Sequence, residues 1–398
     1  MKTSLALASA GVLLLLALSG CWSNMELTDR AFVQAAAIDL SDRGQYRLTA
    51  LVYKPGGMNA TESSVPNSDK SYISIVTENR SLLGAIRDAT NELGRKLQLS
   101  HMRSLMISEK TARTRNIGQI LDFFTRDHEP RGDISVVVTK GNAGRYLLLP
   151  PFIETTMGQQ FKEIEHKSSA YSGKALEVTL TDLDIRSKEE VQIGAVPYFR
   201  LGKERKTPAS AHGLAVIDFA EGKMKGYIPP ESTPYTIMLM GKFQGGVVEL
   251  PCKTGGPLSG LADSFEIRKT DAKVEPAVKG GRLTIGIVVR LEGSIGELSC
   301  RRAVTDEEIA AFTEALSREV ETRLTAAMQL LQREKADVIG VGEHLSRHRP
   351  RLWRQWKPEW PNRFADGDFH IEVKVKLTST GIQSGESKFV KEQRPPAP

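Results

Sequence analysis

Residues that could carry out chemistry are few and isolated in this chain. His128-Glu129 resembles the start of a zinc-protease motif, but no histidine follows four residues after His128, so the ligand spacing fails. Asp182 and Asp184 are neighbours on one segment, whereas acid–base catalysis needs two carboxylates that converge from different environments. The chain also lacks a P-loop, a G-x-G-x-x-G motif and a G-x-S-x-G motif. These patterns predict a protein that is not an enzyme and needs neither a metal nor a cofactor.

Cys21 is the residue whose surroundings predict a definite chemical modification. Lys2 precedes an apolar run from Leu5 to Leu18, which is too short for a comfortable membrane span and typical of a signal peptide. The run ends in Leu18-Ser19-Gly20-Cys21, an aliphatic residue and two small residues before a cysteine. This lipobox pattern predicts a signal peptide over residues 1–20 and a lipid on Cys21, which would hold the mature chain on a membrane. An ordinary signal peptide and an uncleaved anchor are the alternatives.

Two cysteines remain after Cys21, at Cys252 and Cys300. Export would permit a disulfide between them, and closing a loop of that length would stabilise the fold by roughly 4 kcal/mol in the chain-entropy model. The sequence leaves open whether the two residues meet. They do not form a metal site, because no pair of histidines accompanies them.

An aromatic cluster near the end of the chain has two interpretations. Trp353, Trp356, Trp360 and Phe364 lie at three- and four-residue steps, so they could share a helical face until Pro358 interrupts it. One interpretation is a small core packed on the long helix that precedes the cluster. The other is an interface for a partner protein, because tryptophan is favoured at interface hot spots.

The spacing of apolar residues predicts alternating strands and helices. The clearest strand runs from Phe369 to Thr378, where apolar and polar residues alternate, and the longest helix follows a capping box from Thr305 to Glu308. Apolar residues then recur at helical spacing from Ile309 to Leu331. Further segments are predicted as strands (46–54, 73–76, 103–108, 134–139, 213–219, 235–240 and 283–291) or helices (81–97, 117–126 and 160–169).

The chain is long enough for more than one core. Removal of 20 signal-peptide residues from 398 leaves 378, which predicts two or three domains. The polar segment 201–210 lacks periodicity and marks the main boundary. We therefore expect an N-terminal domain over 21–200, a C-terminal domain over 206–380 with a possible split near residue 270, and a disordered tail over 381–398. The mature net charge is +5 after loss of Lys2, and the charges are interspersed, so no nucleic-acid partner is expected.

Several segments resemble one known family. The mature start Cys21-Trp22-Ser23-Asn24-Met25-Glu26-Leu27 is similar to that of the Ger(x)C family, the lipoprotein C subunit of nutrient germinant receptors in endospore-forming bacteria. Ser23 departs from the acidic residue usual there, so no role for a charge is carried over to this position. Further similar segments follow in the family's order over nearly all of the mature chain: Arg95 to His101, Phe124 to Asp127, His212 to Val216, and Ala336 to Gly340 with Trp353, Trp360 and Phe364 beyond it.

The resemblance implies a fold and a role. The fold expected is α+β, with several domains of mixed sheets flanked by helices. The expected place is the outer face of the spore inner membrane, and the expected partners are a multi-pass A subunit and a transporter-like B subunit. The family has no known catalytic residues, so a scaffold role is expected. A solute-binding lipoprotein of a transporter is the alternative function, although the repeated α/β lobes of that class are not evident, and a lipid-anchored cell-wall hydrolase is a third.

Overall fold

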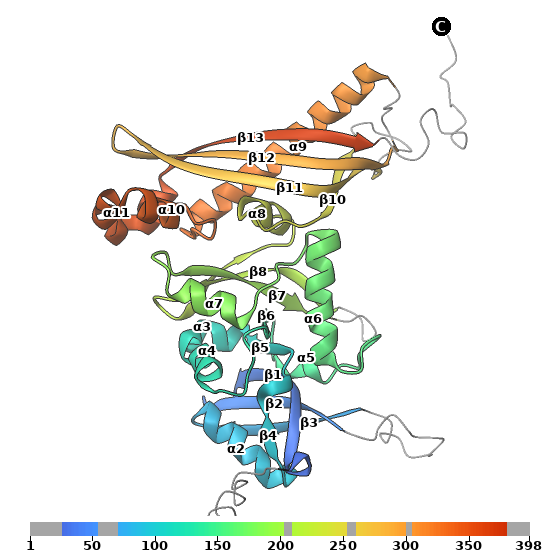
Figure 1. Cartoon of the computed structure of the whole chain (residues 1–398), viewed down its shortest axis with the longest axis vertical. Helices are drawn as coiled ribbons and strands as arrows, with labels where there is room; N and C mark the ends of the chain where they lie inside the picture. Colours follow the sequence, from blue (N-terminus) through green and yellow to red (C-terminus); the bar gives the residue numbers. More distant parts are fainter. Residues whose placement is uncertain (1–25, 55–70, 203–208, 253–259, 300–304, 380–398) are drawn as a thin grey trace, which may run out of the picture.

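The chain forms two mixed β-sheets with helices packed against them, so the α+β class predicted from the sequence is confirmed (Figure 1). The computed structural model describes residues 26–54, 71–202, 209–252, 260–299 and 305–379. The predicted signal peptide, Cys21 and the tail from residue 381 lie outside the described residues.

The first sheet combines a parallel centre with antiparallel borders. Its order is β3-β2-β1-β5-β6-β7-β8-β9, and the short β4 pairs with β1 beside β5. The pairings of β1 with β5, β5 with β6 and β6 with β7 are parallel, while β2, β3, β8 and β9 join through antiparallel pairs. The strands are β1 (Arg30–Leu40), β2 (Tyr46–Tyr53), β3 (Tyr72–Asn79), β4 (Lys96–Gln98), β5 (Ser104–Ser108), β6 (Ser135–Thr139), β7 (Ile193–Arg200), β8 (Ser210–Asp218) and β9 (Lys223–Ile228).

Helices cover both faces of this sheet. Strand β1 shows why, because Ala36 and Ile38 belong to one hydrophobic core while Ala35 and Ala37 belong to another. Every residue of β5 and β6 is buried, as expected for parallel strands covered on both sides. The helices of this region are α2 (Leu82–Leu93), α3 (Glu109–Thr114), α4 (Ile117–Arg126), α5 (Gly144–Leu147), α6 (Met157–Lys167) and α7 (Leu180–Ser187), with short helical turns η1 (Leu27–Asp29), η2 (Leu99–His101) and η3 (Ser168–Ser172).

The second sheet has four strands and lies at the other end of the molecule (Figure 1). Its order is β10 (Gly246–Pro251), β11 (Ala262–Lys279), β12 (Arg282–Glu297) and β13 (Asp368–Ser379). The long hairpin of β11 and β12 turns at Gly280 and Gly281, whose φ angles of 55° and 79° favour glycine. Strand β13 then pairs parallel with β12, which requires the chain to cross over the sheet in between.

The long helix α9 (Asp306–Arg333) makes most of that crossover, as its spacing predicts. Thr305 Oγ1 accepts the backbone N–H of Glu308, and Glu308 Oε2 accepts that of Thr305, which is the predicted capping box. The apolar stripe is buried at Phe312, Leu316, Val320, Leu324, Met328 and Leu331. Three short helices complete the crossover, namely α10 (Val341–His348), α11 (Pro350–Trp356) and α12 (Trp360–Ala365), with the turn η4 (Lys357–Glu359) at Pro358.

The prediction of a strand over residues 235–240 is wrong. This segment lies in helix α8 (Thr233–Leu239), where Ile237, Met238 and Leu239 are all buried. A short run of apolar residues does not distinguish a buried strand from a buried helix by periodicity. Pro234 in the first turn was the available indication, because proline is favoured at the start of a helix.

The suggested split near residue 270 is also wrong, because Thr270 lies inside β11 and pairs with Leu291 of β12. The main boundary at 201–210 falls between β7 and β8, which pair with each other, so the first sheet continues through it. The chain passes from one sheet to the other between Ile228, the end of β9, and Gly246, the start of β10.

Cys252 directly follows β10 and is disulfide-bonded. Its backbone N–H donates to Leu261 O at 3.0 Å, and nearby Asp263 accepts the N–H of Ser299 at 2.7 Å. Cys252 is thus hydrogen-bonded to Leu261, just before β11, and the start of β11 is hydrogen-bonded to Ser299, just after β12. Cys300 lies outside the described residues, so its pairing with Cys252 stays a prediction.

Candidate functional site

The four aromatic residues singled out in the sequence come together in one cluster. The rings of Trp353 and Trp360 meet edge-to-face with centroids 5.1 Å apart, and those of Trp360 and Phe364 lie 6.3 Å apart. The guanidinium of Arg363 lies over the ring of Trp356 at 4.6 Å. All four aromatic side chains are buried, with at most 6% of any residue exposed. The structure therefore favours the core interpretation over the partner interface, because the rings are covered by the chain itself.

Asp337 organises this cluster from its centre. It lies between α9 and α10 and is 1% exposed. Its carboxylate accepts the N–H groups of Val341 and Gly342, at 3.0 and 2.7 Å, and Nε1–H of Trp360 at 3.1 Å. Burial raises the pKa of Asp337, and these donors oppose that shift by stabilising the charged form. One carboxylate thus caps the start of α10 and fixes the position of the Trp360 ring.

The same cluster joins the two parts of the chain. Glu343, in the first turn of α10, accepts the backbone N–H of Val191 at 2.9 Å. Glu190 Oε2 accepts Trp353 Nε1–H at 3.0 Å and is paired with Lys357 Nζ at 2.6 Å. These bonds connect the C-terminal helices to the segment that leads into β7 of the first sheet.

Gly342 allows this close approach. A Cβ placed there would lie 2.3 Å from Val191 Cγ2 and 2.8 Å from Trp360 Nε1. Any other residue would push α10 away from the segment before β7. On the other side of the cluster, Gln332 of α9 donates to the carbonyls of Phe364 and Gly367, at 3.1 and 2.6 Å. The cluster is therefore fixed both to α9 and to the first sheet.

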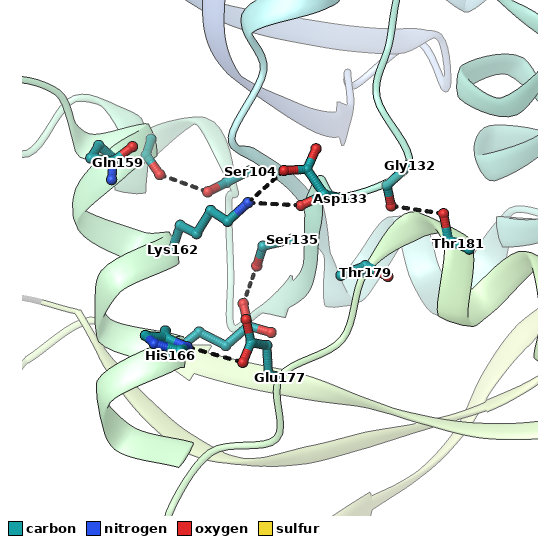
Figure 2. Close-up of polar contacts among 12 residues, drawn as sticks. Ser104, Gly132, Asp133, Ser135, Gln159, Lys162, His166, Glu177, Thr179 and Thr181 are labelled. Atoms are coloured by element: carbon teal, nitrogen blue, oxygen red, sulfur yellow. Dashed lines mark hydrogen bonds and ion pairs between the residues drawn. The ribbon is translucent and has the colours of Figure 1, made fainter. Parts of the chain in front are cut away.

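Another buried carboxyl group belongs to Glu165 of α6, a helix that packs on the first sheet. It is 1% exposed, contacts Ser135 Oγ of β6 and accepts the N–H of Val178 at 2.7 Å. Figure 2 shows this region, where Lys162 reaches Asp133 and His166 reaches Glu177. Burial raises the pKa of Glu165 to about 8, so this carboxyl binds a proton at neutral pH.

Two segments that carry the family resemblance meet beside α2. Glu129, just after the segment 124–127, accepts Lys96 Nζ at 2.9 Å and the N–H of Leu99 at 3.0 Å. Burial alone would raise the pKa of Glu129, but these bonds lower the pKa below its usual value. The hollow between these residues and α2 has a volume of about 40 Å³. Ligand sites are usually about 300 Å³ or more, so this hollow does not fit a nutrient molecule.

Sequence reasoning did not find Asp337, Glu343, Glu190 or Glu165. Asp337 lies in the family-like segment 336–340, but nothing local indicates that Trp360 is its partner. Across the described ranges, no group of three or more His, Cys, Asp or Glu side chains could hold a metal ion. None of the helices in the described ranges combines the length and the apolar composition of a membrane span.

The bond between Trp360 and Asp337 predicts a specific loss of stability. In Trp360→Phe the ring is retained in part, but Asp337 loses a donor in a buried site, so we expect the free energy of unfolding to fall by about 1–3 kcal/mol more than in the control. The measurement is urea denaturation at pH 7. Trp356→Phe is the matched control, because it makes the same change in volume at a similarly buried site and leaves the bond from Trp360 to Asp337 in place. Equal losses in the two variants would contradict this role of Asp337.

The buried Glu165 predicts a pH dependence of stability. Folding raises the pKa of Glu165. The protonated carboxyl therefore contributes its full share to the free energy of unfolding below about pH 4.5, and this contribution is lost as the pH rises through about 8. Glu165→Gln mimics the protonated acid and should flatten this part of the profile, removing a slope of at most about 1.4 kcal/mol per pH unit. Urea denaturation between pH 4.5 and 9 measures it. Glu163→Gln on the same helix should keep the native profile; an unchanged profile in Glu165→Gln would refute the assignment.

Comparison with known proteins gives consistent matches along the chain. Residues 23–201 match the family model of the spore germination protein N-terminal domain, and residues 212–381 match that of the spore germination B3/GerAC-like C-terminal domain. Spore germination protein KC of Bacillus subtilis (strain 168) is 25% identical over 96% of this chain and 97% of its own length. Spore germination protein B3 of the same organism is also 25% identical, over 92% of this chain and 96% of its own length.

The fold agrees with a solved structure. The crystal structure of the GerBC protein aligns with a TM-score of 0.57 at 21% identity, covering 86% of this chain and 96% of that one. At this identity the likeness shows the fold alone, and the two family models, which together span most of the chain, show the family. This chain is a member of the family of spore germination proteins, as the resemblance to the Ger(x)C family predicts.

Proposed function

We propose that this chain is the lipoprotein subunit of a nutrient germinant receptor and acts as a scaffold for membrane-embedded subunits. The observation that carries the proposal is the match of both family models in order, from residue 23 to residue 381, to spore germination proteins. The relatives that match over nearly their whole length are also named as spore germination proteins.

The proposed place of action is the outer face of the spore inner membrane. The lipobox at Cys21 supports it, since lipid chains on this residue would hold the protein at a membrane surface. Four residues separate Cys21 from Glu26, the first described residue, so the five steps of chain between the two span at most about 18 Å when extended. The anchor would therefore keep the first sheet close to the bilayer.

The proposed partners are a multi-pass A subunit and a transporter-like B subunit. Tethering to the same membrane raises the effective concentration of the chain near such partners without any new contact. The contacts of Asp337, Glu190 and Glu343 support a scaffold, because they hold the two sheets in a fixed relation. A fixed body can stabilise one arrangement of its partners, which a pair of loosely linked domains would do less well.

Nutrient-triggered release of dipicolinate from spores tests this function. Deletion of the gene in the native host should abolish the response to at least one nutrient, and Cys21→Ala should do the same because the chain then lacks its lipid. Ser19→Ala is the matched control, since alanine is also small enough for the lipobox. Spores that carry this variant should germinate normally. Immunoblots of membrane fractions must show where each variant accumulates.

The outcomes separate the parts of the proposal. If dipicolinate release fails in the deletion strain but not in the Cys21→Ala strain, the receptor role is supported and the anchor is not needed for it. A normal response to every nutrient, in a strain that also lacks its paralogous receptors, would contradict the receptor role. Direct binding of a nutrient by the purified chain would instead favour a solute-binding protein.

A further inference from the structure

The segment between α5 and α6 exposes apolar side chains in an unusual concentration. Leu148, Phe152 and Ile153 are 56%, 58% and 88% exposed, whereas the other exposed large hydrophobic residues of the described chain lie singly on separate elements, apart from Ile73 and Val76 of β3. The segment reads Leu148-Leu149-Pro150-Pro151-Phe152-Ile153 and contains no charged or polar side chain. We call residues 148–153 the apolar loop.

This apolar loop is held in a fixed conformation. Leu149 packs inward against the core that contains Phe161 and Phe199, so the chain is pinned at its start. At its end, Gln160 Oε1 accepts the N–H groups of Phe152, Ile153 and Glu154 at 3.2, 3.1 and 3.4 Å. Gln160 belongs to α6 and is only 8% exposed. The exposure of Phe152 and Ile153 is therefore built into the fold.

The backbone N–H groups from Leu149 to Ile153 are either absent or paired within the protein. Pro150 and Pro151 have no N–H, and the N–H of Leu149 donates to Tyr146 O at 3.3 Å. The N–H groups that follow are those accepted by Gln160. In a lipid phase every unpaired backbone N–H would cost several kcal/mol, so this pairing of the N–H groups lowers the cost of entry for the loop.

The apolar loop lies close along the chain to the proposed lipid anchor, which favours a bilayer as its partner. The start of α6 is packed directly on β1, because a Cβ at Gly158 would lie 2.7 Å from Gln34 O. Gln34 is four residues, or about 13 Å, from the start of β1 at Arg30. The proposed lipid at Cys21 precedes Glu26 by at most about 18 Å of chain. With the four further steps from Glu26 to Arg30, these lengths bring the apolar loop within reach of the membrane that holds the anchor.

We propose that the apolar loop is a second membrane contact, which inserts Phe152 and Ile153 into the interfacial region of the bilayer that holds the lipid anchor. The proposal rests on the proposed lipidation of Cys21. Two points of attachment, the lipid and the loop, orient the first sheet on the membrane, whereas a single point of attachment leaves the orientation free.

The test uses the full lipoprotein reconstituted in vesicles of phosphatidylglycerol and phosphatidylethanolamine. An environment-sensitive fluorophore is attached to Ile153→Cys, and the matched control carries it on Val247→Cys. Val247 is 54% exposed on β10, in the second sheet at the far end of the molecule (Figure 1). The unsubstituted protein, labelled in the same way, gives the background from native cysteines.

We expect the fluorophore at position 153 to be quenched by lipids that carry a nitroxide on their acyl chains, and to be several-fold less accessible to aqueous iodide than that at position 247. Equal accessibility to iodide in a lipidated chain that floats with the vesicles would overturn the loop contact alone. Protection from iodide without quenching by lipid would also overturn it, because it indicates a protein contact. A chain that has no lipid on Cys21 and does not float would contradict the anchor and the loop contact together.

Discussion

The attachment of the C-terminal helices to the first sheet is the constraint on which the rest of the structure depends. Glu343 and Glu190 bring the start of α10 and the ring of Trp353 against the segment that enters β7. Asp337 holds the start of α10 in the orientation that this contact needs. Without these bonds, the two sheets would still meet where η3 contacts β10 and where Lys225 of β9 donates to Lys335 O, but fewer polar contacts would fix their angle.

This arrangement requires the burial of acidic groups, which is unfavourable by itself. Asp337 is 1% exposed and Glu343 is 8% exposed, and an isolated charge at such sites would strongly destabilise the fold. Both are stabilised by backbone N–H groups, and those from Val341 and Gly342 at the start of α10 favour a negative charge. The acids therefore act as specific connectors, since each lies where only a particular backbone segment can supply its donors.

The sequence was sufficient where structure follows from local pattern. The capping box at Thr305, the buried stripe of α9 and the alternation of β13 all follow from residues within a few positions of one another. It was insufficient where the partner is remote, as for Glu343 and Val191, which are 152 residues apart. Helix α8 was missed because its buried residues fill a short run that suits a strand equally well. The aromatic cluster was found, but its burial depends on segments that no local pattern brings near it.

Hydrogen exchange at the amide of Val191 tests the central connection most directly. That amide should be protected in the native chain, and Glu343→Ala should raise its exchange rate about tenfold or more, because a bond to a charged acceptor is worth about 1.5–3 kcal/mol. Glu359→Ala is the control, since this exposed residue pairs with Arg363 on the outside of the same helical cluster. Fast exchange at Val191 in the native chain, or no response to Glu343→Ala, would contradict the account of one body held together at this contact.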